Sequence, residues 1–355
     1  MFRTLLVIGV IAMITSNNSF AEKEFTYHND SSFDAGAVKS IKIEMRIGDI
    51  SIAKSHSGKV EVNFKNDVYA SDQEEADRYN KEVRYNAELK GDNLIISIEL
   101  PRHSRHRKGI VTRFLQGEWD EDYSPMLKVS VPDSKDIQIE SASANIDASD
   151  VACNLDIKSA SSDLVLENTS GMVHSDVTSG DVDIMGHRGS ITIKANSSDI
   201  KIAEVEGDVD TYTSSGDGDF NKVKGALKSV SNSGDFRIYD IDGDLDARTS
   251  SGDIEVNSVT GSVSAGTVSG DIKLNSLAAN EGVFDIKSVS GDIQVEISPD
   301  FKGNVQASTV SGSIENSMAM ESETSTESQL RGRIGQGNGK LSVSTTSGDI
   351  NIDKF

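Results

Sequence analysis

Apolar and polar residues alternate along most of this chain, and the alternation restarts at a fixed interval. Each restart is marked by the triplet Ser-Gly-Asp or a close variant. The third residue of the triplet recurs every 18 positions, at Asn145, Asp163, Asp181, Asp199, Asp217, Asp235, Asp253 and Asp271, and then at Asp292, Ser313 and Asp349 after steps of 21, 21 and 36. A second glycine recurs in phase with it, from Gly171 to Gly261. A fixed period of this length is typical of a solenoid.

Within each repeat, the apolar residues occupy every second position after the triplet, as in Ile254-Glu255-Val256. A period of two predicts a β-strand with one inward and one outward face. We expect each 18-residue coil to hold two short strands and two turns, and successive coils to stack in parallel about 4.8 Å apart. The predicted fold is therefore all-β, a parallel β-solenoid (β-helix) with inward columns of Ile, Val and Leu. These columns contain Gly218 and Asn316 in place of an apolar residue.

The N-terminal part repeats the coil pattern but carries an insertion. Ser71-Asp72-Gln73-Glu74 has the spacing of a capping box and predicts a short polar helix. Alternating apolar residues at 83–89 and 94–100, separated by Lys90-Gly91-Asp92-Asn93, predict a β-hairpin. We therefore divide the chain into residues 1–21, a first coil with the inserted helix, hairpin and charged loop at 22–131, and solenoid repeats at 132–355. A long polar loop is expected at about 317–338.

Residues 1–21 have the features of a secretory signal peptide. Arg3 precedes an apolar stretch from Leu5 to Ile14, and Ser19-Phe20-Ala21 has the small-x-small pattern of a cleavage site. The apolar stretch is shorter than the roughly 20 residues that span a bilayer, and no later stretch is long enough. We expect the protein to be exported, to the periplasm or to the cell exterior.

Composition narrows the function classes. The chain has 35 Lys and Arg against 57 Asp and Glu, a formal net charge of −22, which argues against nucleic-acid binding because phosphates would be repelled. Cys153 is the only cysteine, so an intramolecular disulfide framework and a multi-cysteine zinc site are both excluded.

The row of aspartates is a candidate cation site. Carboxylates about 5 Å apart in a stack repel each other by roughly 1 kcal/mol in water, so something must offset the repulsion. Calcium could do so, with the ligands Asp217, Asp235, Asp253, Asp271 and Asp292. Backbone N–H groups at the turn could also do so. Asn145 and Ser313 keep a side-chain oxygen without a charge, which favours the turn.

A column of Ser and Thr lies just before the triplets, for example at Thr249, Thr267 and Ser288. Its phase with the apolar columns favours an inward direction. We expect these hydroxyl groups to form a buried ladder, donating up the stack and accepting from below. The alternative is an outward hydroxyl array.

The insertion holds the strongest charge contrast of the chain. A basic run is followed by an acidic one that includes the only tryptophan. One interpretation is a solvated loop whose two halves pair with each other. The other is a patch that binds an anionic glycan or a phosphate, with the indole as a stacking platform. Its ligand-binding residues would be Arg102, His103, Arg105, His106, Arg107, Lys108 and Trp119.

No catalytic constellation is evident, so we expect no enzyme. Cys153 falls at a turn position and has no histidine nearby in the sequence, which favours a bystander thiol. His187 occupies an inward column that holds Val205 and Val223 in the next coils, and this favours a core role.

The repeated Ser-Gly-Asp coils, the opening Ile47-Gly48-Asp49-Ile50, the inserted hairpin and the strand Leu127–Pro132 resemble the bacterial "putative adhesin" family, a domain of unknown function. The resemblance covers roughly residues 40–355 and implies a β-solenoid at the cell envelope. It supplies no catalytic or binding residues.

Two classes of function remain after this resemblance. The first is a non-enzymatic envelope protein that binds a surface glycan or protein or acts as a scaffold. The second is a carbohydrate-active enzyme on a β-helix, which would need a carboxylate pair facing a cleft. A calcium-dependent structural rod is compatible with the first class. We expect no resident cofactor other than such calcium.

Overall fold

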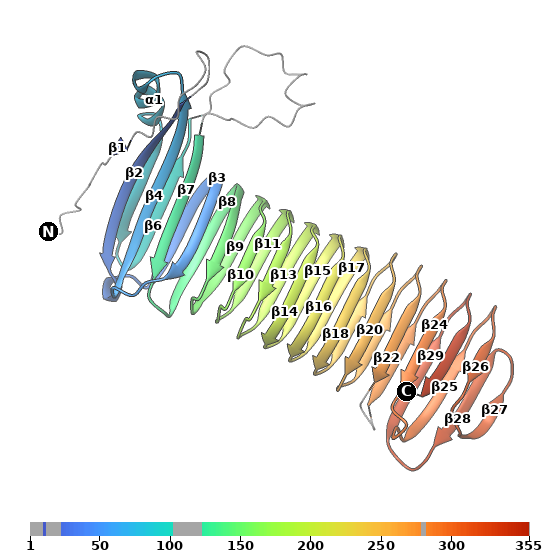
Figure 1. Ribbon diagram of the computed structural model, residues 1–355. Coiled ribbons are helices and arrows are strands. Elements are labelled where there is room, and N and C mark those ends of the chain that lie inside the picture. The colour runs from blue at the N-terminus through green and yellow to red at the C-terminus, as the bar shows by residue number, and fades with distance from the viewer. Residues whose placement is uncertain (1–9, 12–22, 102–122, 278–281, 355) are drawn as a thin grey trace. The chain divides into compact units, whose positions relative to one another are not determined.

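The computed structural model describes residues 10–11, 23–101, 123–277 and 282–354, and most of them lie in β-strands (Figure 1). The described residues group into two compact units, one ending at Asp163 and the other beginning at Leu164. Where the chain is described, no helix is both long and apolar enough to cross a membrane.

The first unit contains the predicted first coil and its insertion. Its elements are β1 (Val10–Ile11), β2 (Lys23–Asp34), the 3-10 helix η1 (Ala35–Ala37), β3 (Ser40–Lys54), β4 (Lys59–Ala70), α1 (Gln73–Asn80), β5 (Arg84–Lys90), β6 (Asn93–Glu99), β7 (Tyr123–Val131), β8 (Lys135–Ser149) and β9 (Cys153–Ser161). Strands β3 and β8 pair in parallel from Ser40↔Asp136 to Ala53↔Ser149. The other edge of β3 pairs with β6 over its first half and with β7 over its second half.

Antiparallel strands extend both halves of this first coil. Strand β6 pairs with β5, which confirms the predicted hairpin, and β7 pairs with β4, which pairs with β2. Helix α1 packs Ala76 and Tyr79 against β2 and β4. Its N-cap is Asp72, which accepts from Glu75 N–H. The N-cap therefore lies one residue after Ser71, where the capping box was predicted.

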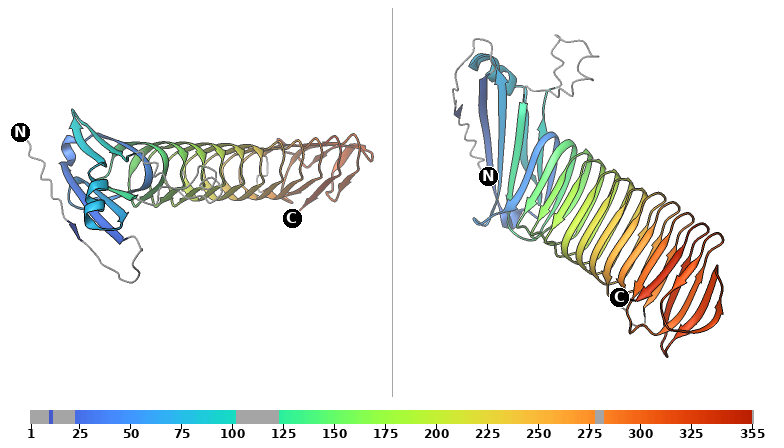
Figure 2. Two further views of the ribbon diagram at one scale, coloured as in Figure 1. Left: turned by 90° about the horizontal axis from the view of Figure 1, so that it is seen from above. Right: turned by 45° about the vertical axis from the view of Figure 1, so that its right-hand side comes forward.

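The second unit is a stack of parallel coils, seen from two further directions in Figure 2. Its strands are β10 (Leu164–Glu167), β11 (Val173–Ser179), β12 (Val182–Met185), β13 (Ile191–Ser197), β14 (Ile200–Glu206), β15 (Val209–Ser215), β16 (Gly218–Lys224), β17 (Leu227–Ser233), β18 (Phe236–Asp242), β19 (Leu245–Arg248), β20 (Ile254–Val259), β21 (Val263–Gly266), β22 (Ile272–Leu277), β23 (Val283–Lys287), β24 (Ile293–Ile297), β25 (Gly303–Ser308), β26 (Ile314–Asn316), β27 (Glu321–Ser325), β28 (Gln329–Ile334), β29 (Gly339–Ser344) and β30 (Ile350–Lys354).

The register of this stack follows the 18-residue period. Val182 pairs with Ile200, Ile200 with Gly218, and Phe236 with Ile254. The residues after the triplets are buried, as the alternation predicts, except Ile314, which is half-buried. The predicted all-β parallel solenoid with two-strand coils is therefore confirmed.

Most of the Ser and Thr column is buried, but its hydroxyl groups do not bond mainly to one another. Thr249 Oγ1 donates to Gly234 O at 3.2 Å, and Thr267 Oγ1 donates to Gly252 O at 3.1 Å. Both acceptors belong to the triplet of the preceding coil. The hydroxyl groups therefore donate to turn carbonyls of the neighbouring coil, which corrects the predicted hydroxyl-to-hydroxyl ladder.

The last coils do not stack in sequence order. Strand β29 lies between β23 and β25, and β30 lies between β24 and β26. The chain thus leaves one layer empty after β24, builds the layer of β25 and β26, and returns to fill the gap with its last two strands. Two of these pairs are Ile293↔Ile350 and Ile314↔Ile350.

The stretch predicted as a long polar loop at 317–338 contains the hairpin of β27 and β28. Strand β28 pairs antiparallel with the outer edge of β25, from Gly303↔Ile334 to Ser308↔Gln329. The hairpin thereby covers an edge that would otherwise leave a row of backbone groups unpaired.

Candidate functional site

The aspartate row forms a hydrogen-bonded ladder along the second unit. In each of its rungs, Oδ1 of one aspartate accepts from the backbone N–H of the equivalent residue in the next coil. The distances are 2.8–2.9 Å for the acceptors Asp199, Asp217, Asp235, Asp253, Asp271 and Asp292. The backbone interpretation of the row is supported, with the donor in the neighbouring coil rather than in the same turn.

The exceptions in the row have positions that explain them. Asn145, in the first unit, donates to Asp49 Oδ1 at 3.3 Å and accepts from Asp163 N–H at 3.4 Å. Ser313 is the last residue of the ladder in space, and both its N–H and its Oγ donate to Asp349 Oδ1. These bonds lower the pKa of Asp349. Ser313 thus ends the ladder as a donor to Asp349.

A second, shorter row was missed in the sequence. Asp208 Oδ1 accepts from Ala226 N–H and Asp244 Oδ1 accepts from Ser262 N–H, at 2.9 and 2.8 Å. The pairs Gly207-Asp208 and Gly243-Asp244 at the second glycine marker were the signal that could have revealed it.

The calcium ligands proposed from the sequence each have one oxygen engaged in this ladder. In the parts of the chain that the structure describes, no three His, Cys, Asp or Glu side chains form a group that could hold a metal ion. Cation binding by the row stays a prediction. Arg102, His103, Arg105, His106, Arg107, Lys108 and Trp119 all lie outside the described residues, so the proposed glycan patch also stays a prediction.

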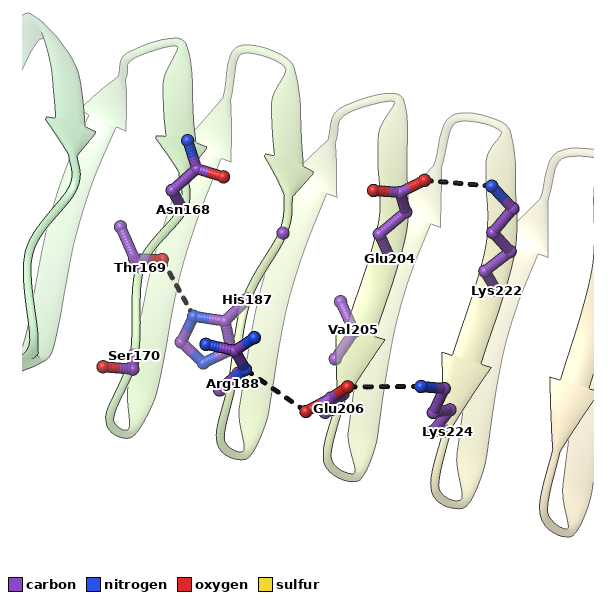
Figure 3. Close-up of a pocket in the computed structure, with 11 residues that line it drawn as sticks. Asn168, Thr169, Ser170, His187, Arg188, Glu204, Val205, Glu206, Lys222 and Lys224 are labelled. Carbon is purple, nitrogen blue, oxygen red and sulfur yellow. Dashed lines mark hydrogen bonds and ion pairs between the residues drawn. The ribbon is translucent and has the colours of Figure 1, made fainter.

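A hollow of about 440 Å³ lies on the side of the second unit (Figure 3). It forms where Gly186 has no side chain and where Asn168 and Ser170 have short ones, next to longer side chains of β14 and β16. The complete lining is Asn168, Thr169, Ser170, Gly186, His187, Arg188, Glu204, Val205, Glu206, Lys222 and Lys224.

A column of left-handed residues shapes this surface. Positive φ angles recur every 18 residues, at Asn168, Gly186, Glu204, Lys222, Asp240 and Ser258, with values from 52° to 69°. Non-glycine residues rarely adopt this conformation. At Glu204 it interrupts the alternation of β14, so that Glu204 and Glu206 are both exposed on either side of buried Val205. This column was not predicted from the sequence.

The charged side chains of the hollow form two ladders across the coils. Lys222 Nζ lies 2.9 Å from Glu204 Oε1, whereas Glu206 takes Arg188 Nε on one oxygen and Lys224 Nζ on the other, each at 3.2 Å (Figure 3). Hydrogen bonds from the two cations lower the pKa of Glu206. The lining therefore carries three cationic groups and two carboxylates.

His187 forms the back of the hollow and is fully buried. Its Nδ1 lies 2.9 Å from Thr169 Oγ1, and its Nε2 lies 3.0 Å from Gly171 O. Because a carbonyl can only accept, Nε2 carries the proton and Nδ1 accepts from the threonine hydroxyl. The predicted core position is confirmed, and burial lowers the pKa of His187.

We expect His187 to make the protein less stable in mild acid. The unfolded chain binds a proton near the ordinary histidine pKa of about 6.5, whereas the folded imidazole resists it. Stability is therefore complete above that pH and falls as the pH drops below it. Urea unfolding at about pH 7.5 and 5.5 should show a smaller pH dependence for His187→Val than for the native chain. Equal pH dependence in both would contradict this role.

Several solved structures resemble the chain. A "putative cell adhesion protein" from Clostridium sporogenes is 9% identical, with 94% of this chain and 100% of that chain covered and a TM-score of 0.22. A "putative lipid binding protein" from Parabacteroides distasonis is 12% identical, with 92% of this chain and 96% of that chain covered and a TM-score of 0.32. A "putative adhesin" from Bacteroides fragilis is 12% identical, with 92% of this chain and 96% of that chain covered and a TM-score of 0.24. No curated protein matches the chain. Residues 185–353 match the family model described as Toastrack DUF4097, which confirms for that part of the chain the predicted resemblance to a "putative adhesin" family of unknown function.

Proposed function

We propose that this chain is an exported, non-enzymatic binding module of the cell envelope that holds an anionic glycan in the hollow of the second unit. The observation that carries this proposal is the excess of cationic groups there. Arg188, Lys222 and Lys224 outnumber Glu204 and Glu206, in a protein whose formal net charge is −22. An anion repelled by most of the surface would find local attraction at this place.

The geometry of Arg188 supports recognition of a carboxylate or sulfate group. Its contact with Glu206 uses Nε, and a guanidinium group has five N–H donors in a planar fork. Its terminal nitrogens can therefore make a bidentate contact with an oxyanion. Short polar side chains at Asn168 and Ser170 border the same hollow, and they can bond to sugar hydroxyl groups.

The carbohydrate-active alternative has less support. A glycosidase needs one carboxylic acid whose pKa is raised so that it can protonate the leaving group. In this hollow the pKa of Glu206 is lowered, because Lys224 and Arg188 donate to it, and Glu204 is paired with Lys222. Both carboxylates are therefore placed to hold cations rather than to transfer a proton.

The test is titration calorimetry of the protein with oligogalacturonate, with a neutral cello-oligosaccharide as the control ligand. Losing a charge-assisted contact costs about 1.5–3 kcal/mol, so Arg188→Ala should weaken oligogalacturonate binding at least tenfold. Lys201→Ala is the matched control, because this exposed lysine of β14 lies outside the lining. The affinity of the Lys201→Ala variant for oligogalacturonate should stay close to that of the native chain.

Two results would count against the hollow. If Arg188→Ala does not weaken binding, the hollow is not the binding site. If binding is lost when Arg102–Lys108 are neutralised, the binding site is the basic run predicted from the sequence. Absence of binding to any acidic oligosaccharide would leave a scaffold as the better account.

A further inference from the structure

The last coil of the chain, residues 339–354, fills a slot between two layers that precede it in sequence. Strands β23 and β24 lie on one side of it, and β25 and β26 lie on the other. Because neighbouring strands are about 4.8 Å apart, the two flanking layers are too far apart to bond to each other. The last coil therefore supplies the partners of both.

The bonds on the two sides of the slot are equivalent. Ile293 N–H donates to Asp349 O and Ile350 N–H donates to Ser313 O, both at 2.9 Å. Thr345 Oγ1 donates to Gly291 O on one side, and Thr309 Oγ1 donates to Gly348 O on the other. Leu341, Val343, Ile350 and Ile352 of the inserted coil are each at most 1% exposed. The slot thus accepts a coil through a complete backbone ladder and a buried apolar face.

The slot is selective for a coil with glycines at set positions. A Cβ atom on Gly348 would lie 2.2 Å from Gly291 O. A Cβ atom on Gly303, in the opposite wall, would lie 2.0 Å from Gly339 O. A coil with a side chain at the position of Gly348 cannot approach closely enough to pair, and residues 339–354 meet this requirement.

The inserted coil is joined to the rest of the unit by a single short connection. Strand β28 ends at Ile334 and β29 begins at Gly339. Between them, Gly335 and Gln336 are exposed, and Gly335 has a φ of 58°. Nothing in these contacts distinguishes the slot of the same chain from the slot of another copy.

We propose that residues 339–354 are an exchangeable coil, and that two copies of this chain associate by each placing this coil in the slot of the other. Exchange keeps the bonds between the coil and the two walls of the slot, so the two forms differ mainly in the connection at 335–338 and in the entropy of association. The single chain prevails at low concentration because its own coil has a high effective concentration. The exchanged pair gains as the protein concentration rises.

Paired cysteines in the full-length chain test the exchange. Gln294 and Asn351 are register partners in β24 and β30, so Gln294→Cys/Asn351→Cys places one thiol on the slot and one on the coil. Asp285→Cys/Ser342→Cys, in β23 and β29, is a second such pair in case the first fails to fold. The control is Lys201→Cys/Asp219→Cys, at register partners of β14 and β16. Burial raises the pKa of Cys153 to about 12, which keeps this thiol unreactive.

Each variant is refolded at low and at high protein concentration, separated by size and then oxidised. We expect a dimer that grows with concentration. On a non-reducing denaturing gel, this dimer should stay covalently linked for the slot–coil pairs and separate into single chains for the control pair. A chain that remains monomeric at every concentration would overturn the proposal, as would a dimer whose slot–coil pair separates into single chains.

Discussion

Replacing Gly252 with alanine is expected to destabilise the second unit by about 3 kcal/mol or more. Gly252 has a φ of 152°, and a Cβ atom there would lie 2.1 Å from Gly234 O in the preceding coil. The backbone conformation and the layer contact both exclude a side chain. The two coils would have to separate, breaking the bond that Asp253 N–H donates to Asp235 Oδ1.

The midpoint of urea unfolding measures this effect. The matched control is Gly266→Ala in the same unit, because the nearest atom to its added Cβ is Lys287 O at 3.7 Å. That variant should unfold within about 0.5 kcal/mol of the native chain or slightly later. Equal midpoints for Gly252→Ala and Gly266→Ala would show that the layer contact does not limit the stack.

Replacing Phe236 with alanine is expected to cost about 3–5 kcal/mol, the usual range for removing a buried aromatic side chain. Phe236 is 1% exposed, and its ring lies 6.4 Å from that of Phe220 at an interplanar angle of 64°. The two rings fill the space next to Gly218, whose added Cβ would lie 2.8 Å from Phe236 Cδ1. This packing explains why one inward column contains a glycine.

A double-mutant cycle can isolate this packing. Gly218→Ala should destabilise the native chain by overpacking and should cost less in a Phe236→Leu background, where the branched side chain leaves room. Arg237→Ala, at an exposed position of the same strand, is the control and should change stability by less than about 0.5 kcal/mol. Additive effects of Gly218→Ala and Phe236→Leu would contradict direct packing between these positions.

The repeating part of the fold could be predicted because its pattern is local. Ile254 and Val256 are apolar at a period of two, and their equivalents recur one coil later at Ile272 and Leu274. Residues that are 18 apart in sequence are therefore neighbours in space, and the same spacing sets the register. The hydroxyl column was placed on the correct side for the same reason, whereas its glycine acceptors depend on how the turns of adjacent coils approach each other.

The candidate site could be predicted only in part. His187 was assigned to the core from its column, but its place behind a hollow depends on Gly186 and on the short side chains of the two coils around it. Glu204 and Lys222 come together because left-handed residues bend the strands at the same height in successive coils. Such a bend shifts the alternation by one residue, so a search for a period of two in the sequence does not predict it.

The sequence by itself determined the coil: its length, its two strands, its inward columns and the glycines that allow close stacking. Only the tertiary structure decided the order of the last layers. The inward columns of any coil fit those of any other, so the steps of 21 and 36 residues are compatible with more than one stacking order. The edge covered by the β27–β28 hairpin, and the end positions of Ser313 and Asn316, distinguish the observed order. Asn316 is tolerated in these columns because it is only half-buried there and its amide group bonds to the backbone of Met318.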